Sequence, residues 1–209
     1  SLWFNPDAKK FKGDLGKRVY TSRLLGANPE LVLHGGGNTS VKTTEKDFFG
    51  DKVEVLHVKG SGWDLGTIEA AGFAPVRMDA LLKMAKLDTL SDPEMVKQQR
   101  AAMLEPSAPN PSIEAILHAV IPQKFVDHTH ANAVVALTNH KHGRTAVEEV
   151  YGDRVVVIPY VMPGFDLAKA VAKALENIDP FTLDGLILMN HGIFTMHDDA
   201  KTSYELMIQ

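Results

Sequence analysis

The chain has 209 residues, of which 44% are hydrophobic and 23% are charged, the balance of an ordinary globular domain with a sizeable core. Its formal net charge of −4 gives no basic surplus that would point to nucleic acid or an acidic membrane surface. It has no cysteine, which excludes disulfides and thiolate metal sites, so any metal must be bound by His, Asp or Glu. The first residues do not resemble a signal peptide and no apolar run of about 18 residues occurs, so we expect a cytoplasmic enzyme or binding protein.

The first part of the chain predicts one helix followed by strands and glycine turns. Residues 14–26 carry a helical stripe of Leu and Val that ends on a glycine. Residues 30–34 predict a short apolar strand, and residues 39–43 a second strand after a glycine-rich turn. Residues 51–59 alternate apolar and charged side chains, which indicates a strand with one buried face. Strands joined without an intervening helix argue against an all-parallel sheet.

The remaining elements alternate between helices and strands. Ser91 or Asp92 at the N-cap and Pro93 in the first turn predict a helix over residues 91–104. The three prolines of residues 105–112 indicate a loop. We expect further helices at 76–87, 112–121, 131–139, 166–178 and 200–209, and strands at 124–130, 154–161 and, with an internal turn, 184–197. The last helix is unfinished, so we expect a single α/β domain, residues 1–209, that is truncated at its C-terminus.

Three histidines are candidates for a metal site. His128 and His130 stand two residues apart in the predicted strand 124–130, and residues so spaced point to the same face. His191 follows the apolar stretch 184–189 and precedes a glycine, at a strand end where ligand sites usually open. Zinc bound through imidazole nitrogens usually needs four ligands, so the pair alone is weak evidence and a third histidine strengthens it. The alternatives are a solvated strand end for the pair and a turn cap for His191.

Glu114 is a candidate general base. It lies in the first turn of the predicted helix 112–121, whose N-cap would be Ser112, and the positive end of the helix favours the ionised carboxylate. It is either an acid/base group beside the metal, a ligand that substrate displaces, or an ordinary first-turn glutamate. His118 lies four residues on and shares its helix face, as a supporting or core histidine.

Two glycine turns could bind an anion. The stretch HGGGNTS lacks the Gly-Lys-Ser/Thr ending of a P-loop, yet it offers backbone N–H groups with the side chains of Asn38 and Ser40. The stretch VKGSG offers Ser61, and Lys59 adds a positive charge. Each turn alone is more often a tight connection between strands. Together with Ser112 they form three polar segments that could converge on one phosphate.

In this order the motifs resemble the class II aldolase/adducin family. The resemblance rests on five segments: GGGNTS, Ser61-Gly62, Ser112 to Glu114, His128 to His130, and Asn190 to Gly192. Longer stretches such as PSIEAILHAVIPQKFVDHTHA resemble one branch, the N-terminal aldolase half of bifunctional rhamnulose-1-phosphate aldolase/alcohol dehydrogenase proteins. In that branch a short-chain dehydrogenase domain follows, which fits the expected truncation.

The resemblance implies a three-layer α/β/α fold around a mostly antiparallel sheet, and a homo-oligomer, commonly a tetramer. It implies Zn²⁺, or another divalent metal, bound by the three histidines, with Glu114 as the acid/base residue. It places Asn38, Ser61, Gly62 and Ser112 at the substrate, a sugar phosphate. This chain departs from the family at Ile113, where a second serine is frequent, and at Lys59, where a less charged residue is frequent.

The resemblance therefore implies a zinc-dependent aldolase of carbohydrate metabolism. The expected reaction is cleavage of a deoxy-ketose 1-phosphate, in the first place rhamnulose 1-phosphate, to dihydroxyacetone phosphate and lactaldehyde. Two alternatives stay open. An epimerase, dehydratase or decarboxylase would use the same metal site, and an adducin-like domain would have no catalytic role.

Overall fold

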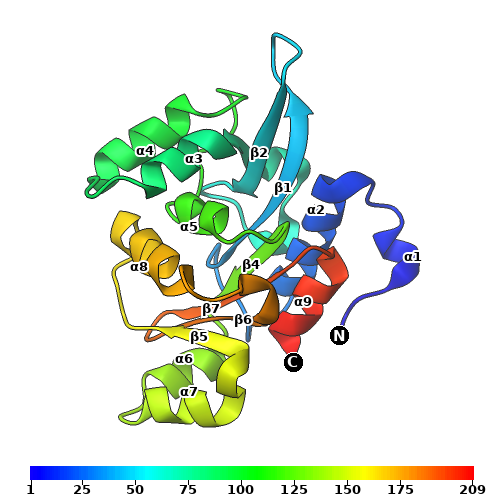
Figure 1. Cartoon of the computed structure of the whole chain (residues 1–209). Coiled ribbons are helices and arrows are strands. Elements are labelled where there is room, and N and C mark those ends of the chain that lie inside the picture. The colour runs from blue at the N-terminus through cyan, green and yellow to red at the C-terminus, as the bar shows by residue number, and fades with distance from the viewer.

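Seven strands form one sheet in the order β3-β2-β1-β4-β7-β6-β5 in the computed structural model, which describes residues 1–209 (Figure 1). Every neighbouring pair is antiparallel except β5 and β6, which are parallel. The strands are β1 (Asn38–Lys46), β2 (Lys52–Lys59), β3 (Phe73–Arg77), β4 (Phe125–Thr129), β5 (Val155–Ile158), β6 (Gly185–Leu188) and β7 (Gly192–His197). The predicted mostly antiparallel sheet is confirmed.

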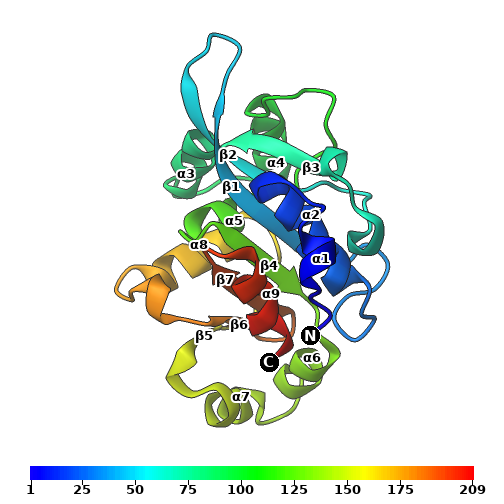
Figure 2. The ribbon, with the colours of Figure 1, turned by 90° about the vertical axis from the view of Figure 1, so that its right-hand side faces the viewer.

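Helices cover both faces of this sheet, which confirms the predicted three-layer fold. One face is covered by α3 (Met78–Ala85), α5 (Ala115–Val120) and α8 (Phe165–Leu175), with α4 (Asp92–Ala101) packed on α3. The other face carries α2 (Gly13–Gly26) and α9 (Ala200–Ile208), which lie in front of the sheet in Figure 2. The remaining helices are α1 (Asn5–Ala8), α6 (Asn132–Thr138) and α7 (Gly143–Tyr151).

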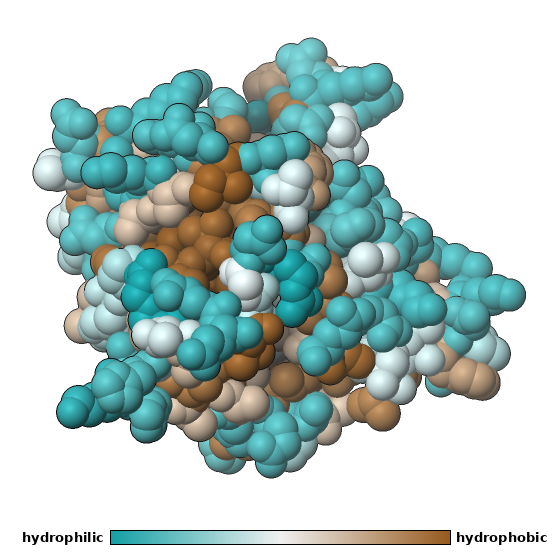
Figure 3. Space-filling model, turned by 60° about the horizontal axis from the view of Figure 1, so that its bottom comes forward, coloured by the Kyte–Doolittle hydropathy of each residue, from teal (hydrophilic) through white to brown (hydrophobic).

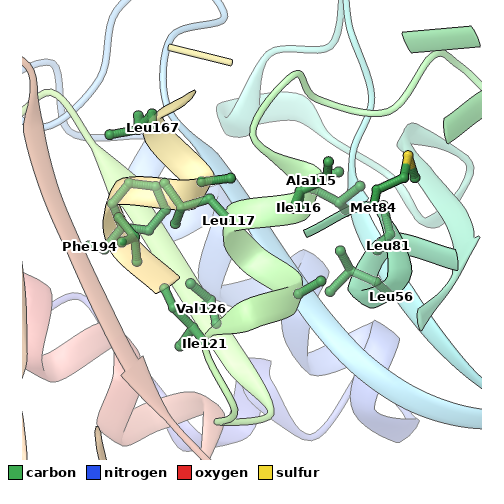
Figure 4. Close-up of a cluster of buried hydrophobic side chains, with 14 of the residues drawn as sticks. Leu56, Leu81, Met84, Ala115, Ile116, Leu117, Ile121, Val126, Leu167 and Phe194 are labelled. Atoms are coloured by element: carbon green, nitrogen blue, oxygen red, sulfur yellow. The ribbon is translucent and has the colours of Figure 1, made fainter. Parts of the chain in front are cut away.

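The largest apolar core lies between the sheet and the helices α3, α5 and α8. Its 24 buried residues come from β2, α3, α5, β4, α8 and β7, among others (Figure 4). Alternation along β4 decides which face each residue serves: Val126 enters this core, whereas Phe125 packs with Val41 on the other face. The same alternation places His128 on the face of Val126 and Asp127 on the face of Phe125.

Several predicted elements differ in the structure. The strand predicted at residues 30–34 is wrong, because this segment forms turns that end with His34, Gly35 and Gly37 at φ values of 48°, 74° and 65°. Left-handed backbone of this kind breaks a strand. The predicted helix 76–87 begins two residues later, because Phe73–Arg77 pairs with β2 as the strand β3. The sequence also did not predict α7.

The face shown in Figure 3 is hydrophilic around its edge, and apolar side chains gather in its hollow. None of the helices has both the length and the hydropathy that crossing a bilayer requires.

Candidate active site

The candidate residues meet at one end of the central strands. β4 runs antiparallel to β1 and to β7, so the last residues of β4 lie beside the first residues of both neighbours. His128 on β4 is paired in register with Asn38, the first residue of β1. His130 follows the end of β4 directly, and His191 directly precedes β7. Sheet topology thus joins histidines that are some 60 positions apart in the sequence.

The ligand nitrogens of His128, His130 and His191 all lie within 4.8 Å of one another. The Nε2 atoms of His128 and His130 are 3.1 Å apart. The Nδ1–H of the fully buried His128 donates to the carbonyl oxygen of Ile193 at 3.0 Å, which leaves Nε2 as an unprotonated ligand atom. This bond to the main chain of β7 fixes both the tautomer and the orientation of the ring.

The three imidazoles are held in the neutral state that binds metals. Burial, followed by the repulsion of neighbouring imidazoles, lowers the pKa of His128 to about 3 and that of His191 to about 4. Burial also lowers the pKa of His130, although Glu114 opposes the shift. Metal ligation requires neutral imidazole, so no proton has to be removed from His128 or His191 at neutral pH.

Glu114 faces the histidines from the opposite wall. Its carboxylate is 5% exposed, and Oε2 accepts a hydrogen bond of 2.7 Å from Nδ2 of Asn38. Oε2 lies 3.5 Å from Nε2 of His128, and Oε1 lies 3.6 Å from Nε2 of His191. Because these histidines are neutral, the contacts are not ion pairs. Oε1 is buried without a hydrogen-bond partner, so it is free to exchange a proton with a ligand.

The local structure around Glu114 corrects the sequence prediction. α5 begins at Ala115 and has six residues, and Glu114 itself occupies the N-cap position, in place of Ser112. Burial raises the pKa of the Glu114 carboxyl, and the hydrogen bond from Asn38 opposes the shift. Desolvation therefore outweighs the helix-end effect on which the prediction relied. A carboxyl that holds its proton more firmly than a surface glutamate suits acid/base work near neutral pH.

These groups fit a divalent cation. Three neutral imidazole nitrogens and a carboxylate oxygen are all electron-pair donors, and they face one another across a few ångströms. Nδ1 of His191 and Oε1 of Glu114 are both buried without hydrogen-bond partners. Three histidines with a further position left open are the ligand pattern of catalytic zinc sites. His128, His130 and His191 could thus hold the ion.

Two glycines allow the backbone to approach this site. A Cβ on Gly192 would lie 2.3 Å from the carbonyl oxygen of Thr129 and 3.2 Å from ring atoms of both His128 and His130. A Cβ on Gly37, whose φ is 65°, would lie 2.7 Å from the carbonyl oxygen of His128. Glycine is therefore required at both positions for β1 and β7 to close around the end of β4.

A cavity of about 410 Å³ opens beside the histidines and Glu114. Lys59 is the cation in its wall: the ammonium is largely buried, donates to the carbonyl oxygen of Gly35 at 3.0 Å, and has its pKa lowered by burial. The lining residues are Gly35, Gly37, Asn38, Lys59, Gly60, Ser61, Gly62, Ser112, Ile113, Glu114, His130, Pro163 and His191. Clefts of about 670 and 880 Å³ elsewhere contain none of these residues.

Of the residues predicted to contact substrate, all but one line this cavity. Ser112 Oγ accepts hydrogen bonds from the backbone N–H of Glu114 at 3.2 Å and from Asn38 at 3.1 Å, which leaves its own hydrogen for a ligand. Ser61 and Gly62 form an exposed part of the rim. Ser40 lies behind the wall, fully buried, with its hydroxyl 2.8 Å from Nδ1 of His118.

Residues 17–209 match the family described as the class II aldolase and adducin N-terminal domain. The chain belongs to this family. It is 44% identical to the N-terminal class II aldolase domain of a conserved protein from Thermoplasma acidophilum, with a TM-score of 0.90 over 99% of this chain and 93% of that one. An L-fuculose-1-phosphate aldolase from Thermus thermophilus shares the fold, with a TM-score of 0.56 and 18% identity over 92% of this chain and 88% of that one.

A longer relative is the Bacillus subtilis protein named "Uncharacterized oxidoreductase YuxG", which is 39% identical over 207 residues. Those residues are 99% of this chain and 30% of the relative. The class II aldolase/adducin domain thus spans about a third of the length of that protein.

Outside the two glycine turns, two cavity residues of this family member were not predicted to contact substrate. Ile113 was noted for replacing a serine, and its side chain is the hydrophobic group in the wall. Pro163 lies in the loop between β5 and α8, and the sequence around it carries no chemical motif that would have placed it in the cavity wall. Only the tertiary structure shows that these two residues line the cavity.

Proposed function

We propose that this domain is a divalent-metal-dependent aldolase that cleaves a deoxy-ketose 1-phosphate, in the first place rhamnulose 1-phosphate, to dihydroxyacetone phosphate and lactaldehyde. One observation carries the proposal: an unpaired oxygen of Glu114 lies against a cluster of three neutral histidines, and two of them, His130 and His191, share one cavity with Glu114 and the ammonium of Lys59. Family membership and the L-fuculose-1-phosphate aldolase fold support a sugar phosphate as substrate.

Different residues of the cavity would bind different parts of the substrate. Lys59 and Ser112 would hold the phosphate through charge and a hydroxyl donor, and the glycine turn at Gly35 would add backbone contacts. His128, His130 and His191 would hold the divalent ion, preferably zinc. When bound, such an ion supplies Lewis-acid stabilisation of the negative charge that develops on the ketose oxygens.

Glu114 would transfer the proton to and from C3 of the substrate. In cleavage Oε1 of Glu114 takes the proton of the C4 hydroxyl, the C3–C4 bond breaks as the C4 oxygen becomes the aldehyde carbonyl, and the electron pair of the broken bond passes to the ketone end of the substrate. Oε1 of Glu114 then returns a proton to C3, which yields dihydroxyacetone phosphate. In condensation the same oxygen removes that proton. The bond from Asn38 to Oε2 leaves Oε1 free for this exchange.

The test uses purified protein loaded with zinc and supplied with rhamnulose 1-phosphate, and dihydroxyacetone phosphate is assayed. We expect product from the loaded protein and none from the His191→Ala variant, whose zinc content should fall with its activity. Absence of product from fully loaded wild-type protein, with that ketose and with its stereoisomers, would refute the proposal. Zinc content unchanged by chelators or by His191→Ala would refute the metal site.

Another reaction on the same metal site is the second candidate. The neutral histidines and Glu114 would serve an epimerase, dehydratase or decarboxylase of a sugar phosphate equally well, because each develops negative charge next to a carbonyl. NMR of the products separates these reactions from aldol cleavage in one experiment. A protein that bound no metal and altered no sugar phosphate would instead favour the adducin-like, non-catalytic role.

The assembly expected for this function is a cytoplasmic homo-oligomer, in the first place a tetramer. Sedimentation velocity would establish the number of subunits. In longer relatives, a second domain such as a short-chain dehydrogenase would account for the name oxidoreductase.

A further inference from the structure

A chain of buried side chains lies directly behind Glu114 and reaches away from the cavity. Ser40 Oγ is 2.8 Å from Nδ1 of His118, and Nε2 of the same ring contacts Oδ1 of Asn38. Nδ2 of Asn38 in turn contacts Oε2 of Glu114 at 2.7 Å. Two elements supply these groups: β1 provides Ser40 and Asn38, and α5 provides His118, with Glu114 at its N-cap.

His118 is fixed within this chain as a neutral ring. It is fully buried, and burial, with His128, Lys42 and Arg18 as smaller causes, lowers its pKa well below that of an ordinary histidine. A neutral imidazole carries one donor and one acceptor nitrogen. The edge-to-face contact with Phe194, with ring centres 5.3 Å apart, fixes the plane of the ring. Phe194 also stacks on His128 at 4.2 Å, so it separates His118 from the metal-site histidines.

The direction of every hydrogen bond in the chain follows from its end at Glu114. A carboxylate accepts, so the NH₂ group of Asn38 must face Glu114, and the same group donates to Ser112 Oγ at 3.1 Å. Oδ1 of Asn38 then faces His118, whose Nε2 must be the donor. Nδ1 of His118 is therefore the acceptor, and the hydroxyl of Ser40 donates to it.

We propose that His118 is a positioning residue: its Nε2–H holds the amide of Asn38 in one of its two orientations, and the amide in turn holds the Glu114 carboxylate toward the three histidines. The role rests on the proposed function in one respect, that Glu114 exchanges the proton. Ser40 thereby acts from behind the wall by fixing the tautomer of His118. Without the Nε2–H, Oδ1 of Asn38 would lose its buried partner and the amide would be free to rotate.

Two substitutions at His118 separate positioning from packing. In His118→Gln an amide nitrogen can reach the place of Nε2 and donate to Asn38, whereas in His118→Asn the shorter amide reaches only the place of Nδ1. We expect kcat for rhamnulose 1-phosphate to fall about 10- to 100-fold in His118→Asn, since small misplacement of a catalytic group costs that much, with a smaller change in KM. His118→Gln should restore most of the loss. Equal losses in both variants, or no loss in His118→Asn, would overturn the proposal.

The tautomer of His118 is measurable without any activity. Long-range ¹H–¹⁵N correlation on the histidine-labelled wild-type protein should show His118 protonated at Nε2, and Ser40→Ala should weaken that preference. Protonation at Nδ1 would overturn the proposal even if both His118 variants failed to fold. A wild-type protein that shows the Nε2–H tautomer but cleaves no ketose phosphate would refute the proposed reaction and leave the role of His118 in orienting Glu114 intact.

Discussion

The strands β1 and β4 carry a buried polar cluster on each face, and the two clusters differ in how completely their groups are paired. We call the one on the face of α5 the site cluster, which comprises Asn38, Ser40, Glu114, His118 and His128. We call the one on the face of α2 and α9 the ion-pair cluster, which comprises Arg18, Thr21, Asp127 and Ser203. Asp127 and His128 are sequence neighbours, and strand alternation sends them into different clusters.

In the ion-pair cluster the two buried charges are paired with each other. The guanidinium of Arg18 binds one carboxylate oxygen of Asp127, and Ser203 donates to the other. Thr21 and the carbonyl oxygen of Ser40 accept further hydrogen bonds from Arg18. Both charged side chains are completely buried, and although Nε of Arg18 lacks a partner, the charges neutralise each other. This cluster ties α2 and α9 to the sheet, and both oxygens of its carboxylate are paired.

The site cluster has a fully hydrogen-bonded end at Ser40 and an end at Glu114 where a buried polar atom lacks a partner, which we call its open end. From Ser40 to Oε2 of Glu114 every side chain has a partner, but Oε1 of Glu114 has none, and neither has Nδ1 of the adjacent His191. Buried polar groups without partners are costly, so they are retained where a ligand or an ion completes them. The two clusters therefore differ at their carboxylates: Asp127 has both oxygens paired, whereas Glu114 keeps one oxygen without a partner on the face that we propose to be functional.

The largest expected effect follows from replacing the open end of the site cluster. Glu114→Gln keeps an acceptor for Asn38 but cannot exchange a proton, so kcat should fall by about 10²- to 10⁴-fold. Thermal stability should stay the same or rise, because a buried carboxyl is removed. Steady-state kinetics and thermal melts of the metal-loaded variant measure the two effects. A variant that melts much earlier but keeps its kcat would place Glu114 with the structural residues.

Breaking the ion-pair cluster should have the opposite pattern. Asp127→Ala leaves the buried guanidinium of Arg18 without its counter-charge and should lower the free energy of unfolding by about 3–5 kcal/mol. The matched control is the double variant Arg18→Met/Asp127→Leu, which removes both charges and should recover much of the loss. Urea unfolding measures the stability of both, and metal analysis of the folded protein should find an unchanged zinc content. Loss of zinc without loss of stability would show that the two clusters are not independent.

The sequence predicted the two clusters very unequally. The histidines and Glu114 stand in short motifs whose order identified the family, so the residues of the open end were predicted before the fold. The ion-pair cluster was not predicted, because Arg18 and Asp127 are 109 positions apart and each has an ordinary neighbourhood in the sequence. Ser40 was predicted at the substrate, and only the register of β1 shows that its side chain lies behind the wall. Short motifs identify residues by their chemistry, whereas contacts between residues distant in the sequence can be recognised only once the pairing of the strands is known.

The pH dependence of metal binding tests the electrostatics of the open end. With pKa values of about 3 for His128 and about 4 for His191, these ligands stay neutral well below pH 6, and protons compete at His130 first. The Kd for zinc should therefore rise by tenfold or less per pH unit between pH 6 and 5. Three histidines with the ordinary pKa of about 6.5 would approach a thousandfold per unit. Competition titrations with a chelator of known affinity give this slope, and a value near a thousandfold would contradict the neutral, desolvated site.

The smallest effects should come from two serines, Ser203 of the ion-pair cluster and Ser112, which borders the site cluster at Asn38 and Glu114. Ser203→Ala removes the donor to Asp127 and leaves a buried carboxylate oxygen short of a partner, which should cost about 1–3 kcal/mol of stability and leave kcat unchanged. Ser112→Ala removes a hydroxyl that borders the cavity, so water can replace it; stability should change by less than about 1 kcal/mol while KM for the phosphate substrate rises. Unfolding curves should therefore show the larger loss of stability in Ser203→Ala, and steady-state kinetics should show the larger rise in KM in Ser112→Ala. If instead Ser112→Ala lowered stability as much as Ser203→Ala and left KM unchanged, the hydroxyl of Ser112 would serve the internal hydrogen bonds to Asn38 and Glu114. It would then not contact the substrate.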